Sequence, residues 1–293
     1  MSTRKWITAA LAALLGLCVL LAVVAVPRTP AAQTADVAIL MYHAFTEDEA
    51  NTGSLCTPAS EFARQLSALR DAGYTSVGYA DLIEFVNGEG KLPEKPLLIS
   101  IDDGYQNNLD LAAPLLEKYG FCANIAVIGV SIGHTTYKDT DIPITPHFSL
   151  EDARPWIERG VLTVTTHSYD MHQVTAVDGN DCRRGVLQMP GEAEPDYIAA
   201  LTQDYTRAQE QLAGLPGTPL PVFTYPFGAY SELSERVLQA LGVQVTVTTE
   251  GGANRLVKGE PETLRLLHRI HVWRGTKPDM LLSRIDGALQ ALR

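Results

Sequence analysis

Short runs of apolar residues that alternate with helical patterns limit the fold of this chain more than any other feature. A short unbroken apolar run is typical of a strand that is covered on both faces. The first such run has the sequence VAILMY, at residues 37–42. The predicted strands are residues 37–42, 97–101, 123–128, 162–166, 222–225, 243–248 and 264–272.

Helical patterns lie between these runs, and two of them carry start signals. Thr57 is predicted to cap a helix that has Pro58 at its first position. Ser149 and Asp152 resemble a capping box at the start of another helix. The predicted helices are residues 58–73, 79–86, 109–119, 150–160, 196–212, 232–241 and 279–292.

This alternation favours a parallel sheet, and the number of units favours a closed or nearly closed barrel. We therefore predict an α/β fold, a distorted (β/α) barrel of about seven strands, formed by residues 36–293 as one domain. With 293 residues, 46% of them hydrophobic, the chain can bury a large core. Chemistry in such a barrel collects at the C-terminal ends of the strands. The stretches 131–148 and 176–194 are predicted to be long surface loops beside that site.

The first 27 residues have the pattern of a membrane anchor. Arg4 and Lys5 precede an uncharged apolar run at residues 6–26, long enough at 1.5 Å per residue to cross a hydrocarbon core of about 30 Å. We predict a transmembrane signal anchor at residues 1–27 and a linker at residues 28–35. The basic residues place the N-terminus in the cytoplasm and the domain outside the cell membrane. Cleavage of the segment would instead give a secreted protein.

The net charge of the chain excludes one class of partner. Acidic residues outnumber basic ones by 34 to 23, which gives a net charge of −11. Phosphate binding needs clustered Lys and Arg, so nucleic acid is not an expected partner.

Outside the predicted anchor, Cys56, Cys122 and Cys182 allow at most one internal disulfide, and isolated thiols are the simpler interpretation.

Two adjacent carboxylates follow the predicted strand 97–101. Asp102 and Asp103 precede Gly104, and an Asp-Gly pair after a strand is by itself more often an ordinary turn. Gly104 allows the chain to turn, so that one carboxylate can bind a cation while its neighbour stays free as a base. Nearby positive charge would keep that neighbour ionised. The residues alone leave open which carboxylate has which role.

Two histidines follow the predicted strand 162–166. His167 and His172 are five residues apart and would not share a face of a regular helix. They converge only if His167 ends the strand and His172 lies on an irregular turn; the alternative is two ordinary surface histidines. Together with a carboxylate from another strand end, they would form a facial triad with open positions. Nitrogen and oxygen ligands of this kind favour Zn²⁺ first, with other divalent first-row ions possible.

Two further strand ends offer polar groups. The segment Tyr225-Pro226-Phe227-Gly228 is either a core strand followed by a turn or a rigid wall whose Phe227 N–H faces a developing oxyanion. His43 follows the first apolar strand. A single histidine at a strand end is more often structural, but near a metal ion it can serve as a general acid.

These segments together resemble the polysaccharide deacetylases with a NodB homology domain, carbohydrate esterase family 4, over most of residues 37–272. The family's motif Thr-Phe-Asp-Asp-Gly-Tyr is similar to residues 100–105, Ser-Ile-Asp-Asp-Gly-Tyr. The resemblance implies that Asp102 is the catalytic base and that Asp103 is a metal ligand. The longer spacing between His167 and His172, as metal ligands, resembles the poly-N-acetylglucosamine deacetylase branch.

The chain departs from the family pattern in two places. The motif Arg-x-Pro-Tyr is here Thr224-Tyr225-Pro226-Phe227, so another residue must orient the base. Arg269 resembles an arginine on the last strand of the branch and is the candidate. The general acid is assigned by resemblance to His43, in Met-Tyr-His, with His268 as the alternative.

The resemblance implies a metal-dependent hydrolase that removes N-acetyl groups from N-acetylhexosamine residues of an extracytoplasmic polysaccharide. Poly-N-acetylglucosamine, peptidoglycan and chitin-like polymers are the candidate substrates. Two other interpretations stay open. One is a catalytically inactive glycan-binding module of the same fold, and the other is a metal-dependent amidase that acts on a small non-sugar amide.

Overall fold

The computed structural model describes residues 33–48, 50, 53–217 and 219–293. The predicted anchor, residues 1–27, and most of the predicted linker lie outside the described residues. Residues 34–293 form one compact unit. Among the described residues, no helix combines the length and the apolar character needed to cross a membrane.

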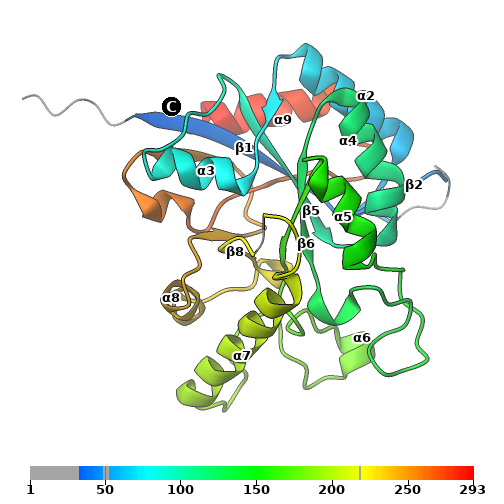
Figure 1. The fold of residues 1–293 in the computed structure, drawn as a ribbon, viewed down its shortest axis with the longest axis vertical. Coiled ribbons are helices and arrows are strands. Elements are labelled where there is room, and N and C mark those ends of the chain that lie inside the picture. The colour runs from blue at the N-terminus through cyan, green and yellow to red at the C-terminus, as the bar shows by residue number, and fades with distance from the viewer. Residues whose placement is uncertain (1–32, 49, 51–52, 218) are drawn as a thin grey trace, which may run out of the picture. The chain divides into compact units, whose positions relative to one another are not determined.

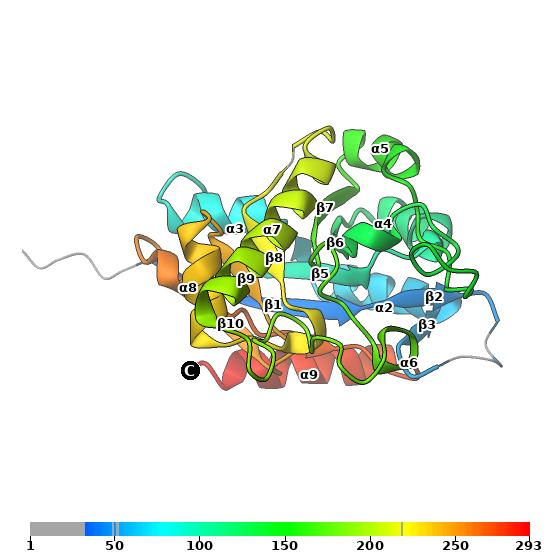
Figure 2. The same cartoon turned by 90° about the horizontal axis from the view of Figure 1, so that it is seen from below.

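Seven strands follow one another along a single hydrogen-bonded path that curls into a half-barrel (Figures 1 and 2). The order is β10-β1-β5-β6-β7-β8-β9; β4 pairs with β5, and β11 pairs with β1. A separate pair, β2 and β3, lies outside this sheet. The bounds are β1 Thr34–Tyr42, β2 Ala44–Thr46, β3 Cys56–Pro58, β4 Thr75–Ser76, β5 Pro96–Asp103, β6 Ala123–Val127, β7 Leu162–Thr166, β8 Val222–Thr224, β9 Val245–Val247, β10 Ala253–Val257 and β11 Ile270–His271.

Helices cover the outer face of the curled sheet (Figure 1). Residues of α2, α4, α5 and α9 pack in one cluster with β1, β5, β6 and β7, whereas α7 and α8 pack on β8. The bounds are α2 Ala59–Asp71, α3 Tyr79–Val86, α4 Ala113–Tyr119, α5 Leu150–Glu158, α6 Thr175–Asp178, α7 Glu194–Leu212, α8 Glu232–Ala240 and α9 Pro278–Gln290. The predicted helix 79–86 and the Ser149 capping box are confirmed.

Some predicted element ends were wrong, for local reasons. Thr57 does not cap α2; it pairs with Phe45 in the small sheet, and Pro58 is the N-cap. The helix predicted at 109–119 starts as a π-helix, Asn108–Ala112, and becomes α4 only at Ala113. Pro114 explains this widened turn, because it has no N–H to donate to the preceding turn.

The C-terminal part of the sheet differs most from the prediction. The strand β10, which pairs antiparallel with β1, was missed because its sequence, ANRLV, is not an unbroken apolar run. The strand predicted at 264–272 was wrong for most of its length, since β11 has only two residues. Leu266 has a φ of 54°, which breaks an extended strand. Leu267 nevertheless pairs with Val247, so this irregular segment runs along β9 at the open side of the half-barrel.

The side chains of β5 alternate between the two faces of the sheet. Leu97, Ile99 and Ile101 belong to the cluster under the outer helices. Leu98 belongs to the inner cluster, together with residues of β8, β9 and β10. Because side chains alternate along a strand, the inner face continues through Ser100 to Asp102. The half-barrel therefore carries a carboxylate into its interior at the C-terminal end of β5.

Candidate active site

Asp102 lies inside the half-barrel at the end of β5 and is only 2% exposed. Its Oδ1 accepts a hydrogen bond from Nη1 of Arg269 at 2.7 Å, and its Oδ2 lies 3.9 Å from Nε2 of His43. Burial raises the pKa of Asp102, but Arg269, His167 and His43 together outweigh burial and hold that pKa well below its usual range. Asp102 is therefore a carboxylate at neutral pH.

Arg269 is fully buried, at 0% exposure, and its guanidinium lies against Asp102. Besides Asp102, its guanidinium donates from Nε to the carbonyl of Thr248 at 2.7 Å and from Nη1 to Oγ of Ser100 at 3.1 Å. A buried cation is tolerated only when it is paired and hydrogen-bonded. The family motif has an arginine at the start of segment 224–227, where this chain has threonine. In this structure, Arg269 supplies the guanidinium beside Asp102 instead.

The backbone at Asp103 and Gly104 separates the two carboxylates. Asp103 has a φ of 75° and Gly104 a φ of 86°, which takes the chain out of the strand conformation. Position 104 needs glycine, because a Cβ there would lie 2.8 Å from Cγ1 of Val127. Asp103 is 6% exposed, and its Oδ1 lies near the two histidines instead of Arg269.

His167 and His172 converge on Asp103. Their Nε2 atoms lie 3.8 and 3.6 Å from Oδ1 of Asp103, and one ligand atom from each of the three residues falls within 4.8 Å of the others. His167 directly follows β7, whereas His172 comes from the irregular turn that begins at Ser168, whose φ is 74°. The structure therefore brings together the three residues that the sequence suggested as metal ligands.

The donor set suits a divalent first-row ion such as Zn²⁺. Nδ1 of His167 lies 2.8 Å from the carbonyl of Thr224, which fixes the ring and leaves Nε2 toward Asp103. Burial lowers the pKa of His167 to about 4, so the ring is neutral at pH 7 and its nitrogen can bind a metal ion. Two ligand atoms around a tetrahedral Zn²⁺ lie about 3.4 Å apart, close to the separations found here.

The two candidates for the general acid lie in different surroundings. His43 follows β1 and faces Asp102, with a side chain that is 16% exposed. The carbonyl of His43 accepts a hydrogen bond from Nδ2 of the buried Asn108 at 2.8 Å. His268 is more exposed, at 41%, and its Nε2 lies 3.4 Å from Glu250. The structure thus puts His43, and not His268, beside Asp102.

Phe227 stands at the rim of the site. Its backbone has a φ of 58°, its side chain is exposed, and its ring lies 4.2 Å from that of His172 between centroids. The N–H groups of Gly228 and Ala229 donate to Tyr225 and Pro226, whereas none of the backbone hydrogen bonds of the described residues uses the N–H of Phe227. That N–H remains the predicted oxyanion donor.

Sequence reasoning missed Asp204, a residue of α7 that holds the turn between the two histidines. Its carboxylate accepts hydrogen bonds from the N–H groups of Tyr169 at 2.9 Å and Asp170 at 2.7 Å. Burial raises the pKa of Asp204 to about 6. No local signal identifies it, because an acidic residue on an amphipathic helix is usually solvated.

Replacing Asp204 with alanine is expected to weaken Zn²⁺ binding by about tenfold, as removal of a supporting hydrogen bond near a metal site usually does. The turn that carries His172 would lose two backbone anchors, although Asp204 itself is not a predicted ligand. Isothermal titration calorimetry with Zn²⁺ measures the effect. Asp196→Ala, an exposed position on the same helix, is the control. Equal Zn²⁺ affinities for the two variants would contradict the assignment.

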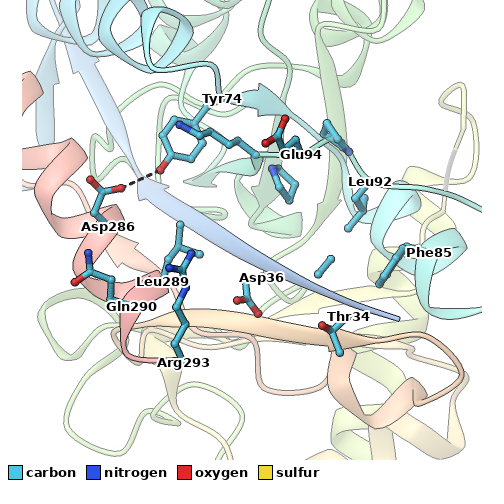
Figure 3. Close-up of a pocket in the computed structure, with 14 residues that line it drawn as sticks. Thr34, Asp36, Tyr74, Phe85, Leu92, Glu94, Asp286, Leu289, Gln290 and Arg293 are labelled. Atoms are coloured by element: carbon cyan, nitrogen blue, oxygen red, sulfur yellow. Dashed lines mark hydrogen bonds between the residues drawn. The ribbon is translucent and has the colours of Figure 1, made fainter. Parts of the chain in front are cut away.

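A large cavity lies elsewhere in the fold. It has a volume of about 580 Å³ and is lined by the first residues of β1, by the segment before β5 and by α9. Figure 3 shows Asp36, Glu94 and Arg293 around it, with Tyr74 hydrogen-bonded to Asp286 at 3.4 Å. Because this cavity lies at the starts of the strands, none of the candidate active-site residues lines it.

Among the described residues, no disulfide forms between the cysteines: Cys56, Cys122 and Cys182 are all free thiols.

Comparisons with known proteins agree with this geometry. Residues 89–246, more than half of the chain, match the family described as polysaccharide deacetylase. The chain is 28% identical over 234 residues to YxkH of Bacillus subtilis (strain 168), across 80% of this chain and 70% of YxkH. It is 21% identical over 226 residues to the poly-beta-1,6-N-acetyl-D-glucosamine N-deacetylase of Escherichia coli (strain K12), across 73% of this chain but only 34% of that protein.

A solved structure shows the same fold. The de-N-acetylase from Aggregatibacter actinomycetemcomitans superposes with a TM-score of 0.73 at 19% identity, and the match covers 85% of this chain and all of that one (100%). His43 and Arg269 lie outside residues 89–246, so the fold and not the family match brings them to the site. The family match identifies this chain as a member of the polysaccharide deacetylase family.

Proposed function

We propose that this protein is a metal-dependent hydrolase that removes N-acetyl groups from N-acetylhexosamine residues of an extracytoplasmic polysaccharide. One observation carries the proposal: Asp103, His167 and His172 gather within 4.8 Å at the end of the half-barrel where Asp102 is held by a buried arginine. Family membership supports deacetylation. The name of the Escherichia coli relative supports poly-N-acetylglucosamine as the first substrate to test, ahead of peptidoglycan and chitin-like polymers.

The mechanism assigns one task to each group. A divalent ion held by Asp103, His167 and His172 would polarise the amide carbonyl and the attacking water. Asp102 accepts the proton of that water, and Arg269 keeps the carboxylate oriented and ionised. The Phe227 N–H donates to the developing oxyanion. His43 then gives a proton to the amine nitrogen as the C–N bond breaks, and acetate and the free amino sugar leave.

Removing the metal is expected to abolish acetate release from poly-β-1,6-N-acetylglucosamine oligomers. The full-length protein is dialysed against a chelator, checked for metal content by mass spectrometry, and assayed before and after addition of Zn²⁺, Co²⁺, Ni²⁺ or Mn²⁺. At least one of these ions should restore turnover. Asp103→Asn should need a much higher metal concentration than the wild type, whereas the exposed control Asp141→Asn should not. Undiminished turnover by metal-free protein would refute the proposal.

The same assay separates the two rival functions. A glycan-binding module would bind the oligomers in a calorimeter but release no acetate with any of these ions. A small-molecule amidase would leave the oligomers and peptidoglycan intact and hydrolyse cyclic or acyl amides instead. Comparing initial rates on poly-N-acetylglucosamine, peptidoglycan, chitin oligomers and these amides identifies the substrate class.

For its location, we propose that residues 1–27 anchor the protein in the cell membrane, with the N-terminus in the cytoplasm and the catalytic domain outside. The basic pair Arg4 and Lys5 before a long uncharged run supports this orientation. High-salt washing of membranes should leave the protein in the pellet, and only detergent should release it, because salt displaces charge-held proteins but not spanning helices. Release by salt, or a mature N-terminus beyond residue 27, would contradict the proposal.

A further inference from the structure

A second cavity, of about 260 Å³, adjoins the predicted metal ligand His172. Cavities that enclose a whole ligand usually measure about 300–1,000 Å³, so this one fits only a portion of a substrate. Its walls come from the loop after β6, the segment before α5 and the segment after His172. The apolar part of its lining consists of Ile128, Val130, Ile144, Val174 and Val177.

Three of the polar side chains that line this cavity offer it little hydrogen-bonding capacity. The hydroxyl of Tyr137 donates to Asp178, and the hydroxyl of Tyr105 hydrogen-bonds Asp103. Both ring nitrogens of His147 are buried in the wall without a hydrogen-bond partner among the described residues, so a ligand inside the cavity does not reach them. A sugar ring would need free partners for its hydroxyl groups, because burying them without hydrogen bonds is unfavourable. The cavity therefore suits an apolar group better than a sugar ring.

The walls of the cavity are held together by ion pairs. Nζ of Lys138 lies 2.6 Å from Oδ1 of Asp170 and 3.1 Å from Oδ1 of Asp178, which joins the loop after β6 to the chain on both sides of His172. Asp178 also accepts a hydrogen bond from the N–H of Val174 at 2.8 Å. A cavity fixed in this way needs little ordering when a ligand enters, and this favours binding.

We propose that this cavity binds the acyl chain of the substrate and that the enzyme hydrolyses N-acyl groups longer than acetyl. The inference rests on the proposed function. His172 belongs both to the predicted ligand set and to the wall of the cavity, and on this ground we place the acyl chain of an amide bound at the ligand set in the cavity. The reaction is the same hydrolysis: the water oxygen forms a bond to the carbonyl carbon, the C–N bond breaks, and the amine takes a proton. The products are a propionate or butyrate ion and a free amino sugar.

The test compares glucosamine oligomers that carry N-acetyl, N-propionyl or N-butyryl groups, with the full-length protein and saturating metal. Burying a methylene group is expected to raise kcat/KM by about fourfold, so the value should rise from acetyl to butyryl. Ile144→Trp, which fills the cavity, should remove this rise and leave turnover of the acetyl substrate intact; Val177→Trp replaces it if that variant does not fold. Ile142→Trp is the matched control, since Ile142 lies on the same loop, is 45% exposed and does not line the cavity.

A kcat/KM that stays constant or falls from acetyl to butyryl would overturn the inference, as would a rise that the cavity-filling variants do not change. If no N-acylated oligomer is hydrolysed, the proposed function fails, and the cavity is judged by binding alone. In that case butyrate, with two more methylene groups than acetate, should bind the Zn²⁺-loaded protein about 15-fold more tightly in a calorimeter. Equal affinities for the two carboxylates would then overturn the acyl-chain assignment independently of catalysis.

Discussion

Replacing Asp102 with asparagine is expected to lower kcat by about 10²- to 10⁴-fold, the usual contribution of a general base. The amide has nearly the same size as the carboxylate but cannot accept a proton from the attacking water. KM for the oligomers should change little, because the proposed contact of Asp102 is with water and not with the sugar. Initial rates of amine release at saturating metal measure both constants.

Two controls separate this loss of chemistry from a damaged site. The Zn²⁺ content of Asp102→Asn should equal that of the wild type, since Asp103, His167 and His172 are unchanged. Asp141→Asn makes the same chemical change on the surface and should keep the full rate. The assay runs well below the thermal midpoint of the variant, because Arg269 loses its buried counter-ion. A kcat within fivefold of the wild type would rule out Asp102 as the base.

Replacing Arg269 with methionine is expected to lower the free energy of unfolding at pH 7 by about 3–5 kcal/mol, because Asp102 would stay buried without its cation. In the wild type, the pKa of Asp102 is lower in the folded protein than in the unfolded chain. Ionised Asp102 therefore stabilises the fold at any pH above the unfolded pKa. This contribution is lost as the pH falls from the unfolded pKa toward the folded pKa. The difference between variant and wild type should therefore shrink below about pH 4. Urea unfolding at pH 7 and at about pH 3.5, followed by circular dichroism, tests this prediction, because these two pH values lie on either side of the ordinary Asp pKa of about 4.

A surface pair provides the matched control for Arg269. Arg255 binds Asp36 through two hydrogen bonds, but its side chain is 41% exposed. Arg255→Met should cost far less stability than Arg269→Met, because exposed ion pairs contribute little. The pH-rate profile gives a second measurement: with Arg269 gone, burial raises the pKa of Asp102, so the acid limb of kcat/KM should move to higher pH. A cost for Arg269→Met no larger than that for Arg255→Met would contradict the buried-pair argument.

Much of the architecture was predictable from local patterns. Strand 162–166 and helix 79–86 have the predicted bounds, because a segment rich in β-branched residues or a helical period needs no distant partner to be recognised. The half-barrel agrees with the predicted distorted barrel, and the family resemblance is confirmed. The antiparallel strand β10 was not predictable in this way. Its residues form a strand because they pair with β1, and no apolar pattern in its own sequence indicates this pairing.

For the site, the motifs pointed to strand ends whose side chains the structure brings together. Asp102, Asp103 and Gly104 are neighbours in sequence, and His167 and His172 are five residues apart, so one short segment carries each pair. These patterns predicted a carboxylate and two imidazoles at one edge of the sheet. They could not say which of the two carboxylates turns toward the histidines. The positive φ of Asp103 decides this, and it depends on how the chain leaves β5 beside Val127.

The amino-acid sequence by itself determined the alternating α/β framework, the metal-ligand candidates and the family. Only the tertiary structure decided what surrounds Asp102. Arg269 reaches it across 167 residues of chain, and His43 reaches it because β1 and β5 pair in parallel and both end at the same edge. Asp204 supports the histidine turn from a helix that no motif marks. Contacts of this kind depend on strand register and helix packing, and neither leaves a pattern in neighbouring residues.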